Sequence, residues 1–338
     1  MSGLAPLTSG APADGGPAPP ATAPARRRGR RVSIDRVSLI VVFVGIPFAG
    51  YVLLVLYPFT QAAYYSLTAW TGFSPDQPFV GLDNYTRIFA DALFLQALGN
   101  SALLLVVVPL VTLTLSFALA ALVTFGGPTT GAVRGLGSSS FYRVVSFFPY
   151  VVPAIVIGII WSQIYNPADG LLNGTLTALG LQRFQDFAWL GQADTAMAAS
   201  TVVIIWSFIG FYMVLFVAAI KGIPAELFEA ARLDGAGRLR SAVHVAIPGI
   251  AGSIRTAYIY MGILALDAFV YMQALNPSGG PDNSTLVITQ QIYRTAFSQG
   301  QFGLACAMGV VLAAVTFLFV AAIFTVSRLL RGPQESRS

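Results

Sequence analysis

The chain has 338 residues, of which 56% are hydrophobic and only 10% are charged, and its mean hydropathy is +0.72. This composition excludes a soluble enzyme and indicates a polytopic membrane protein. One cysteine and one histidine exclude an internal disulfide and a metal site of several Cys or His ligands, so we expect no metal and no cofactor. The formal net charge of +5 agrees with a nucleic-acid partner only if the distribution of Lys and Arg has no other cause.

Residues 1–37 are rich in Ala, Pro and Gly and include a basic cluster from Arg26 to Arg31. They lack the aliphatic periodicity of a packed segment, so we predict a disordered tail. The apolar stretch that follows is too long for the hydrophobic region of a signal peptide and has no small-residue cleavage site. The sequence therefore predicts that this stretch is an uncleaved membrane anchor.

Apolar stretches long enough to cross a membrane recur along the chain. A helix needs roughly 20 apolar residues to span a hydrocarbon core of about 30 Å. Six stretches qualify: Leu39 to Tyr64, Leu98 to Phe125, Val144 to Tyr165, Met197 to Ile220, Ile247 to Tyr271 and Gly303 to Val326. Prolines inside or near them predict kinks: Pro47, Pro58, Pro109, Pro149 and Pro153. We therefore predict an all-α membrane protein with six transmembrane helices in a domain of residues 38–330, followed by a tail of residues 331–338.

The positions of Lys and Arg orient these stretches. Fifteen of the nineteen basic residues lie in the two tails and in the second and fourth connecting segments. The other side carries only Arg87, Arg183 and Arg294, while Arg255 lies within the fifth stretch, about two turns from its cytoplasmic end, where it can snorkel. The positive-inside rule then makes both termini cytoplasmic, together with the loop of residues 221–246. Topology and anionic lipid explain the basic excess, so we expect a lipid membrane and no nucleic acid as a partner.

The segment from Gly222 to Pro248 joins the fourth and fifth apolar stretches. Pro224 suits the first helical position, and Glu226 and Glu229 follow where a helix N-terminus favours negative charge. Gly235 tolerates the left-handed conformation that ends many helices. The pattern predicts a short helix that ends at Gly235, a sharp turn and a second helix that runs to Pro248.

The same segment follows a spaced pattern: E-A-A, three residues, G, nine residues, then aliphatic-x-aliphatic-Pro. The residues that fill it are Glu229, Ala230, Ala231, Gly235, Val245, Ile247 and Pro248. This pattern resembles the signature of the permease subunits of ATP-binding-cassette importers. The flanking Ile223-Pro224 and the sequence DGA at 234–236 resemble the carbohydrate branch, which includes the maltose-type and glycerol-phosphate-type permeases.

The outer connecting segments extend the resemblance to about residues 39–330. Three short sequences are typical of sugar permeases: GLDNY at 81–85, WLG at 189–191, and GGP at 279–281 followed by Ser284-Thr285. The long outer segments and the GGP sequence resemble the F-type partner of the maltose pair more than the G-type. The resemblance implies a type I importer (MetI-like) permease fold in a bacterial cytoplasmic membrane.

The resemblance also implies the partners. These are a second homologous permease subunit, a cytoplasmic ATPase dimer, an extracytoplasmic sugar-binding protein and a carbohydrate substrate. The chain has no G-x-x-x-x-G-K-[ST] stretch, so we predict that it has no catalytic residues and that a partner hydrolyses ATP. The residues expected to couple to that ATPase are Glu229, Ala230, Ala231, Asp234, Gly235 and Pro248.

Asp267 is the unusual residue of the fifth apolar stretch, because a carboxylate inside a span costs about 2.5–3.5 kcal/mol and usually faces a cavity or a partner. The resemblance implies that this part of the span helps line the translocation path. Carboxylates and amides bind sugar hydroxyls, and aromatic rings stack on sugar C–H faces. The residues predicted for the path are Asp267, Phe269, Tyr271, Gln273 and Asn276. Alternatively, Asp267 pairs with a polar group on another span or on the second permease, or takes part in a proton relay.

Two other function classes remain open at this point. The E-A-A signature by itself also allows a permease for a non-sugar solute, against which the GGP segment argues. A six-span channel or receptor without ATP coupling is the second alternative. The sequence shows neither a re-entrant filter between its last two spans nor a helix with regularly spaced arginines, so it does not favour a channel.

Overall fold

The computed structural model describes residues 38–39, 41–125 and 139–331, and throughout them the secondary structure is helical apart from one isolated bridge between Thr68 and Phe79. The all-α prediction is confirmed for these residues. The tail predicted over residues 1–37 and almost all of the tail predicted over residues 331–338 lie outside them. The chain divides into two units between Tyr57 and Pro58.

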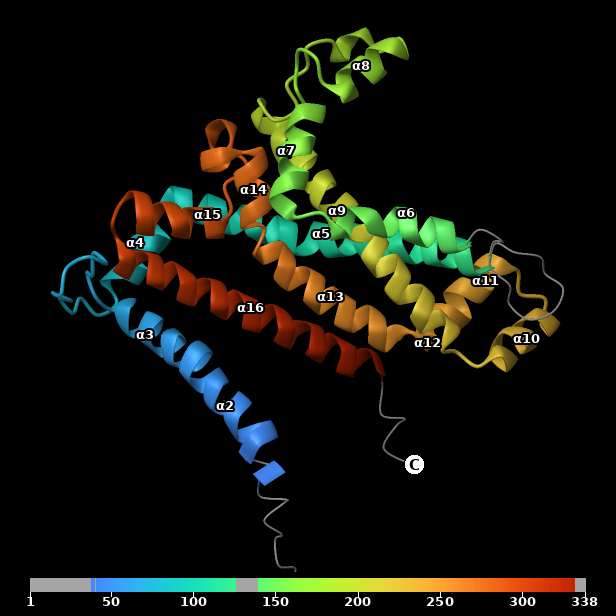
Figure 1. Ribbon diagram of the computed structural model, residues 1–338, viewed down its shortest axis with the longest axis horizontal. Coiled ribbons are helices and arrows are strands. Elements are labelled where there is room, and N and C mark those ends of the chain that lie inside the picture. The colour runs from blue at the N-terminus through green and yellow to red at the C-terminus, as the bar shows by residue number, and fades with distance from the viewer. Residues whose placement is uncertain (1–37, 40, 126–138, 332–338) are drawn as a thin grey trace, which may run out of the picture. The chain divides into compact units, whose positions relative to one another are not determined.

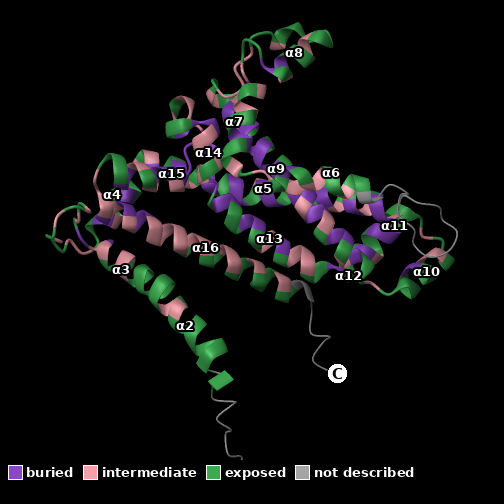
Figure 2. Cartoon of the chain, in the orientation of Figure 1, coloured by how far each residue is buried: buried purple, intermediate pink, exposed green. Residues whose placement is uncertain are grey.

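The first predicted span is a helix from Val41 to Tyr65. It alternates π-helical and α-helical turns: η1 (Val41–Gly45), α2 (Ile46–Tyr51), η2 (Val52–Leu56) and α3 (Tyr57–Tyr65). Pro47 and Pro58 each lie just after one of the π-helical turns, and the helix continues past both prolines. None of the side chains of this helix is buried within the chain (Figure 2). Its exposed side chains are mostly apolar, as expected of a membrane span.

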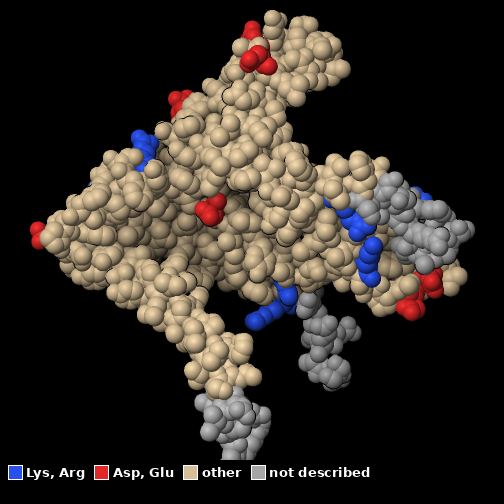
Figure 3. Space-filling view, in the orientation of Figure 1, with Lys and Arg blue, Asp and Glu red and all other residues tan. Residues whose placement is uncertain are grey.

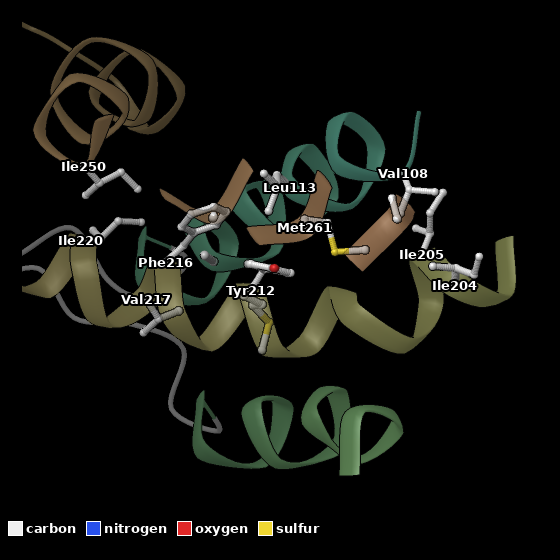
Figure 4. Close-up of a cluster of buried hydrophobic side chains, with 14 of the residues drawn as sticks. Val108, Leu113, Ile204, Ile205, Tyr212, Phe216, Val217, Ile220, Ile250 and Met261 are labelled. Carbon is white, nitrogen blue, oxygen red and sulfur yellow. The ribbon is translucent and has the colours of Figure 1, made fainter. Parts of the chain in front are cut away.

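Three long helices form the core of the second unit: α5 (Ala92–Phe125), α9 (Ala193–Lys221) and α13 (Ala251–Leu266). α9 and α13 both pack on α5 (Figure 1). Figure 4 shows Leu113 of α5, Phe216 of α9 and Met261 of α13 pointing toward one another, and all three are buried. The apolar faces of three separate stretches thus make one core.

The last helix, α16 (Phe302–Arg331), lies beside α13 and is far less buried than α9 (Figures 1 and 2). The close approach of α16 to α13 requires Gly262 of α13, because a Cβ there would collide with the Phe319 ring of α16. The side of α16 turned away from α13 remains apolar and exposed, with Phe317 and Leu318 as its largest side chains. This is the surface expected of a helix in contact with lipid or a second subunit.

Two of the predicted spans are broken. The third consists of α6 (Ser139–Val151) and α7 (Ala154–Ile164), and Phe141–Val151 and Ala154–Ile164 meet at 98° around Pro153. The kink predicted at Pro153 is confirmed, whereas α6 continues through Pro149 and α5 continues through Pro109. In the residues described, four helices are long and apolar enough to cross a membrane, or up to six if each bent pair is one span.

The fifth predicted stretch, Ile247 to Tyr271, is divided among several helical elements. Three elements, α11 (Arg238–Ser241), η4 (Ala242–Ala246) and α12 (Ile247–Gly249), lead to a bend of 74° before α13. α13 then ends at Leu266, and α14 (Phe269–Leu275) begins separately. The physical reason is that α14 packs on α7, where the missing side chain of Gly158 makes room for Ala274.

The segments predicted to lie on the outer side of the membrane form short helices held by buried amides. These are α4 (Asp83–Ala90), α8 (Leu171–Ala178), η3 (Gln182–Phe184), η5 (Pro277–Gly279), η6 (Pro281–Asn283), α15 (Ile288–Tyr293) and η7 (Arg294–Ser298). Asn84 Nδ2 donates to the carbonyls of Ser66 and Thr68 at 2.9 and 2.8 Å. Trp189 Nε1 donates to Asn173 Oδ1 at 2.7 Å. The outer sequences GLDNY and WLG therefore contribute buried structural hydrogen bonds.

Candidate functional site

The helix predicted after Gly222 is α10 (Ala225–Leu233). Pro224 has φ −53° and ψ 133° and precedes the helix, so the first helical residue is Ala225, one position later than predicted. Because ψ of Pro224 is extended, the chain changes direction between α9, which ends at Lys221, and α10. Glu226 lies in the first turn, where the helix dipole favours a negative charge, and its side chain is exposed.

The end of α10 is fixed by Gly235, whose φ is +76°. The N–H of Ala236 donates to the carbonyl of Ala231 at 2.8 Å, and the N–H of Gly235 donates to that of Arg232 at 3.0 Å. This pair of bonds is the Schellman arrangement, with Gly235 in its left-handed position. The helix stop predicted at Gly235 is confirmed. Asp234 is the exposed residue just before this turn.

One aromatic contact holds α10 to the core. Phe228 is only 4% exposed, and its ring centroid lies 5.5 Å from that of Phe125 at the end of α5. On the other side, Ile223 fills the space above Gly249, where a Cβ would come within 2.6 Å of its Cδ1. α10 is therefore tied to α5 and to α12 as well as to α9. Sequence reasoning missed Phe228, although a lone aromatic among the charged residues of a short helix was a usable signal.

The opposite face of α10 is open. Leu227 and Leu233 are 52% and 90% exposed, and Ala230 and Glu229 between them are exposed as well. Pro248 is exposed in α12. Figure 3 shows acidic and basic side chains together at the end of the second unit where α10 and α11 lie. Exposed leucines surrounded by polar side chains form a surface suited to a protein partner.

A cavity of about 650 Å³ lies between α6, α9 and α13. Its lining is largely aromatic and hydroxyl-bearing: Tyr150, Phe208, Phe211, Tyr212, Leu215, Gly252, Ser253, Thr256, Ala257, Tyr260 and Leu264. Tyr150 and Phe211 stack with centroids 4.5 Å apart. The approach of α6 to α9 depends on Gly210, because a Cβ there would collide with the Ser146 backbone. These residues come from three helices far apart in the sequence and were not among the predicted path residues.

The residues predicted for a translocation path fall into separate places. Asp267 directly follows α13 and continues, at helical spacing, the line of Tyr260 and Leu264 that borders the cavity. Its carboxylate is exposed and makes no hydrogen bond or ion pair with the residues that the structure describes. The Tyr271 ring lies 6.2 Å from Phe208, a residue of the cavity wall.

The remaining three path residues face other groups. Phe269 packs on Tyr293, with ring centroids 5.4 Å apart. Asn276 is 3% exposed, and its Nδ2 donates to Ser200 Oγ at 2.6 Å. Gln290 Nε2 donates to Gln273 Oε1 and to the Asn276 carbonyl, both at 3.2 Å. Asn276 and Gln273 thus join α14 to its neighbours, and neither lines the cavity.

Comparison with known proteins identifies the family. Residues 123–332 match the family described as "Binding-protein-dependent transport system inner membrane component". The chain belongs to this family. The resemblance to importer permeases seen in the sequence is confirmed, and this permease is a multi-pass component of the bacterial cytoplasmic membrane.

Curated relatives cover most of the permease. It is 56% identical over 313 residues to the diacetylchitobiose uptake system permease protein NgcF of Streptomyces coelicolor, covering 93% of this chain and 89% of the relative. It is 31% identical to the multiple sugar-binding transport system permease protein MsmF of Streptococcus mutans, covering 80% of this chain and 88% of the relative.

A solved structure supports the fold. A chain of a bacterial alginate transporter of the ATP-binding-cassette class, solved with a periplasmic protein that holds an alginate pentasaccharide, matches with a TM-score of 0.74. The match covers 88% of this permease and 97% of that chain at 20% identity. The type I importer (MetI-like) fold expected from the sequence is therefore confirmed.

Proposed function

We propose that this permease is one of two transmembrane subunits of an ATP-driven importer that moves a sugar or oligosaccharide into the bacterial cell. Family membership and the names of its relatives support an importer, and the aromatic and hydroxyl lining of the cavity supports a sugar. Its proposed partners are a second, homologous permease, a cytoplasmic ATPase dimer and an extracytoplasmic sugar-binding protein.

In the proposed topology each bent helix pair is one span, which gives six spans and cytoplasmic termini. The tails of residues 1–37 and 331–338 then flank a membrane domain of residues 38–330. On the face shown in Figure 3, most Lys and Arg side chains lie toward α10, α11 and the C-terminal end of α16. An excess of basic residues on one side supports placing that side in the cytoplasm.

We propose that α10 transmits the ATPase motion. Its open face, with Glu229, Ala230 and Ala231, would enter a groove of the ATPase, where the alanines allow close approach and the carboxylate accepts a hydrogen bond. The Gly235 turn and Pro248 would keep α10 and the helix after it at a fixed angle. Because Phe228 is buried against α5, a force on α10 also acts on the core.

The cavity between α6, α9 and α13 is the proposed wall of the sugar path. Its size lies within the usual range of small-molecule sites, about 300–1,000 Å³. Tyr150 and Phe211 would stack on the C–H faces of a sugar ring, and Ser253 and Thr256 would hydrogen-bond its hydroxyls. Asp267 would accept hydroxyl protons at the end of α13. The observation that carries this proposal is that α13, one wall of the cavity, continues through a bend into the α10 segment.

The first substrate to test is diacetylchitobiose, which the name of the relative in Streptomyces coelicolor specifies. The experiment compares uptake of radiolabelled diacetylchitobiose, maltose and glycerol 3-phosphate by cells with and without this permease, with its own ATPase and binding protein present. We expect loss of uptake of one sugar only, restored by the wild-type chain. Unchanged uptake of all sugars, with loss of a non-sugar solute, would instead favour the alternative permease class.

Purification of the tagged chain in mild detergent tests the partners. Recovery of a second permease and an ATPase supports the importer. Recovery of the chain alone, under conditions that keep other membrane complexes intact, would favour a channel without ATP coupling.

A further inference from the structure

A second cavity, of about 640 Å³, lies between α13 and α16. The α13 residues that line it, including Arg255 and Tyr258, lie by helical spacing on the other side of α13 from the proposed sugar path. Across the cavity stand apolar residues of α16 such as Phe319 and Ile323. We refer to this cavity as the α13–α16 groove.

The groove contains one charged side chain, Arg255, which is half-buried. Its Nη1 donates to Ser327 Oγ at 3.0 Å, and its Cζ lies 5.5 Å from the centroid of the Phe324 ring. Neither contact neutralises the guanidinium. α12, α13 and α16 contain no Asp or Glu, and neither does α5 behind them. A cation in apolar surroundings is stable only with an anionic or well-solvated partner, which these four helices do not supply.

The depth of Arg255 restricts what that partner is. Arg255 is in the first turns of α13, just after the bend from α12, and Ser327 is in the last turns of α16. In the topology proposed above, both lie near the cytoplasmic surface of the membrane, where anionic lipid headgroups are found. The apolar part of the groove, with Tyr258, Phe319 and Ile323, continues from Arg255 along the two helices, as an acyl chain would.

We propose that the α13–α16 groove binds an anionic phospholipid of the cytoplasmic leaflet. The lipid phosphate pairs with Arg255, and one acyl chain lies against Phe319 and Ile323. The proposal rests on the proposed topology, because only then does Arg255 reach the anionic leaflet.

The position of the groove gives the lipid a mechanical consequence. Ile247 of α12 and Ala251 of α13 both line the groove, on the two sides of the 74° bend. A lipid held there contacts both segments of the bend that joins the α10 segment to the sugar-path wall. We therefore expect phosphatidylglycerol to raise coupled uptake by the wild-type transporter.

The test is native mass spectrometry of the complete transporter, titrated with phosphatidylglycerol or phosphatidylcholine. Arg255→Gln should weaken phosphatidylglycerol binding about fivefold, the effect of one basic residue near an anionic surface. Arg294→Gln, in η7 on the proposed outer side, is the matched control and should leave binding unchanged. Arg255→Lys should retain part of the binding, and recovery of the ATPase with each variant shows that it has assembled.

A second measurement uses no substitution. Photoactivatable phosphatidylglycerol should label wild-type peptides that contain Tyr258 and Phe319. Equal lipid binding by wild type and Arg255→Gln, or absence of label from both peptides, would overturn the proposal, and so would a cross-link that places the second permease in the groove. Loss of sugar uptake by the wild type in every lipid would instead count against the proposed function.

Discussion

Replacing Gly235 by valine is expected to uncouple ATP hydrolysis from uptake. Gly235 has φ +76°, and no heavy atom lies within 4 Å of the position that a Cβ would occupy, so the penalty is conformational and not a collision. A left-handed conformation costs an ordinary residue about 1–2 kcal/mol and is less favourable still for a β-branched one. With about 2 kcal/mol for valine, the turn that ends α10 becomes about thirtyfold less populated.

The assay measures ATPase activity and sugar uptake in proteoliposomes that contain the complete transporter. Gly235→Val should lower uptake at least tenfold, by the same conformational penalty, while ATP hydrolysis continues and the amount of assembled transporter is unchanged. Gly235→Asn should keep most of the uptake, because asparagine tolerates the left-handed region.

The matched control for this turn is Gly237→Thr. Gly237 also has no neighbour within 4 Å of a Cβ, but its φ is −69° and it precedes α11, a position that accepts threonine. We expect near-normal uptake from this variant. Uptake by Gly235→Val within twofold of the wild type, or an equal loss from both variants, would show that the left-handed turn does not matter for coupling.

Three further predictions concern α10 and the proposed path. Phe228→Ala should free α10 from Phe125 at a cost of about 3–5 kcal/mol and reduce recovery of the ATPase with the purified permease. Phe211→Ala should raise the half-saturating sugar concentration for uptake up to about tenfold, through loss of one aromatic stacking surface. Asp267→Asn should also raise the half-saturating concentration, without lowering the yield of assembled transporter, because its carboxylate has no partner among the described residues.

The two aromatic substitutions, Phe228→Ala and Phe211→Ala, each have a control variant in the same part of the molecule. Leu239→Ala, in α11, removes a side chain that is 79% exposed and should leave ATPase recovery normal, unlike Phe228→Ala. Phe148→Ala, in α6, removes an exposed ring outside the sugar-path cavity and should leave the sugar concentration dependence unchanged. A loss of assembly in Asp267→Asn would contradict a path role and favour pairing with another subunit.

The sequence anticipated the α10 segment closely because its signals are local. Pro224 and Gly235 delimit the helix through their own backbone preferences, which act over a few residues. The structure differs only by one residue at the start of α10. The role of Phe228 was not apparent, since burial of its ring depends on Phe125, about a hundred residues earlier in the chain.

The path residues were harder to choose from the sequence. Asp267 stood out as a carboxylate in an apolar stretch, but Asn276 and Gln273 have the same side-chain chemistry whether they face a solute or a buried partner. Asn276 bonds to Ser200 and Gln273 bonds to Gln290, and these two partners belong to other helices. The side chains of Asn276 and Gln273 therefore face buried partners. The aromatic residues of the cavity are spread over α6, α9 and α13, so no local pattern groups them.

By itself the sequence determined that this protein is a helical membrane protein with a short helix ending at Gly235, because hydropathy and backbone preference are properties of each stretch alone. Only the tertiary structure decided that the fifth stretch divides into α13 and α14. That division accompanies a contact between distant helices, Gly158 of α7 with Ala274 of α14. A glycine makes such an approach possible, but the partner that fills the space is set by the packing of the whole bundle.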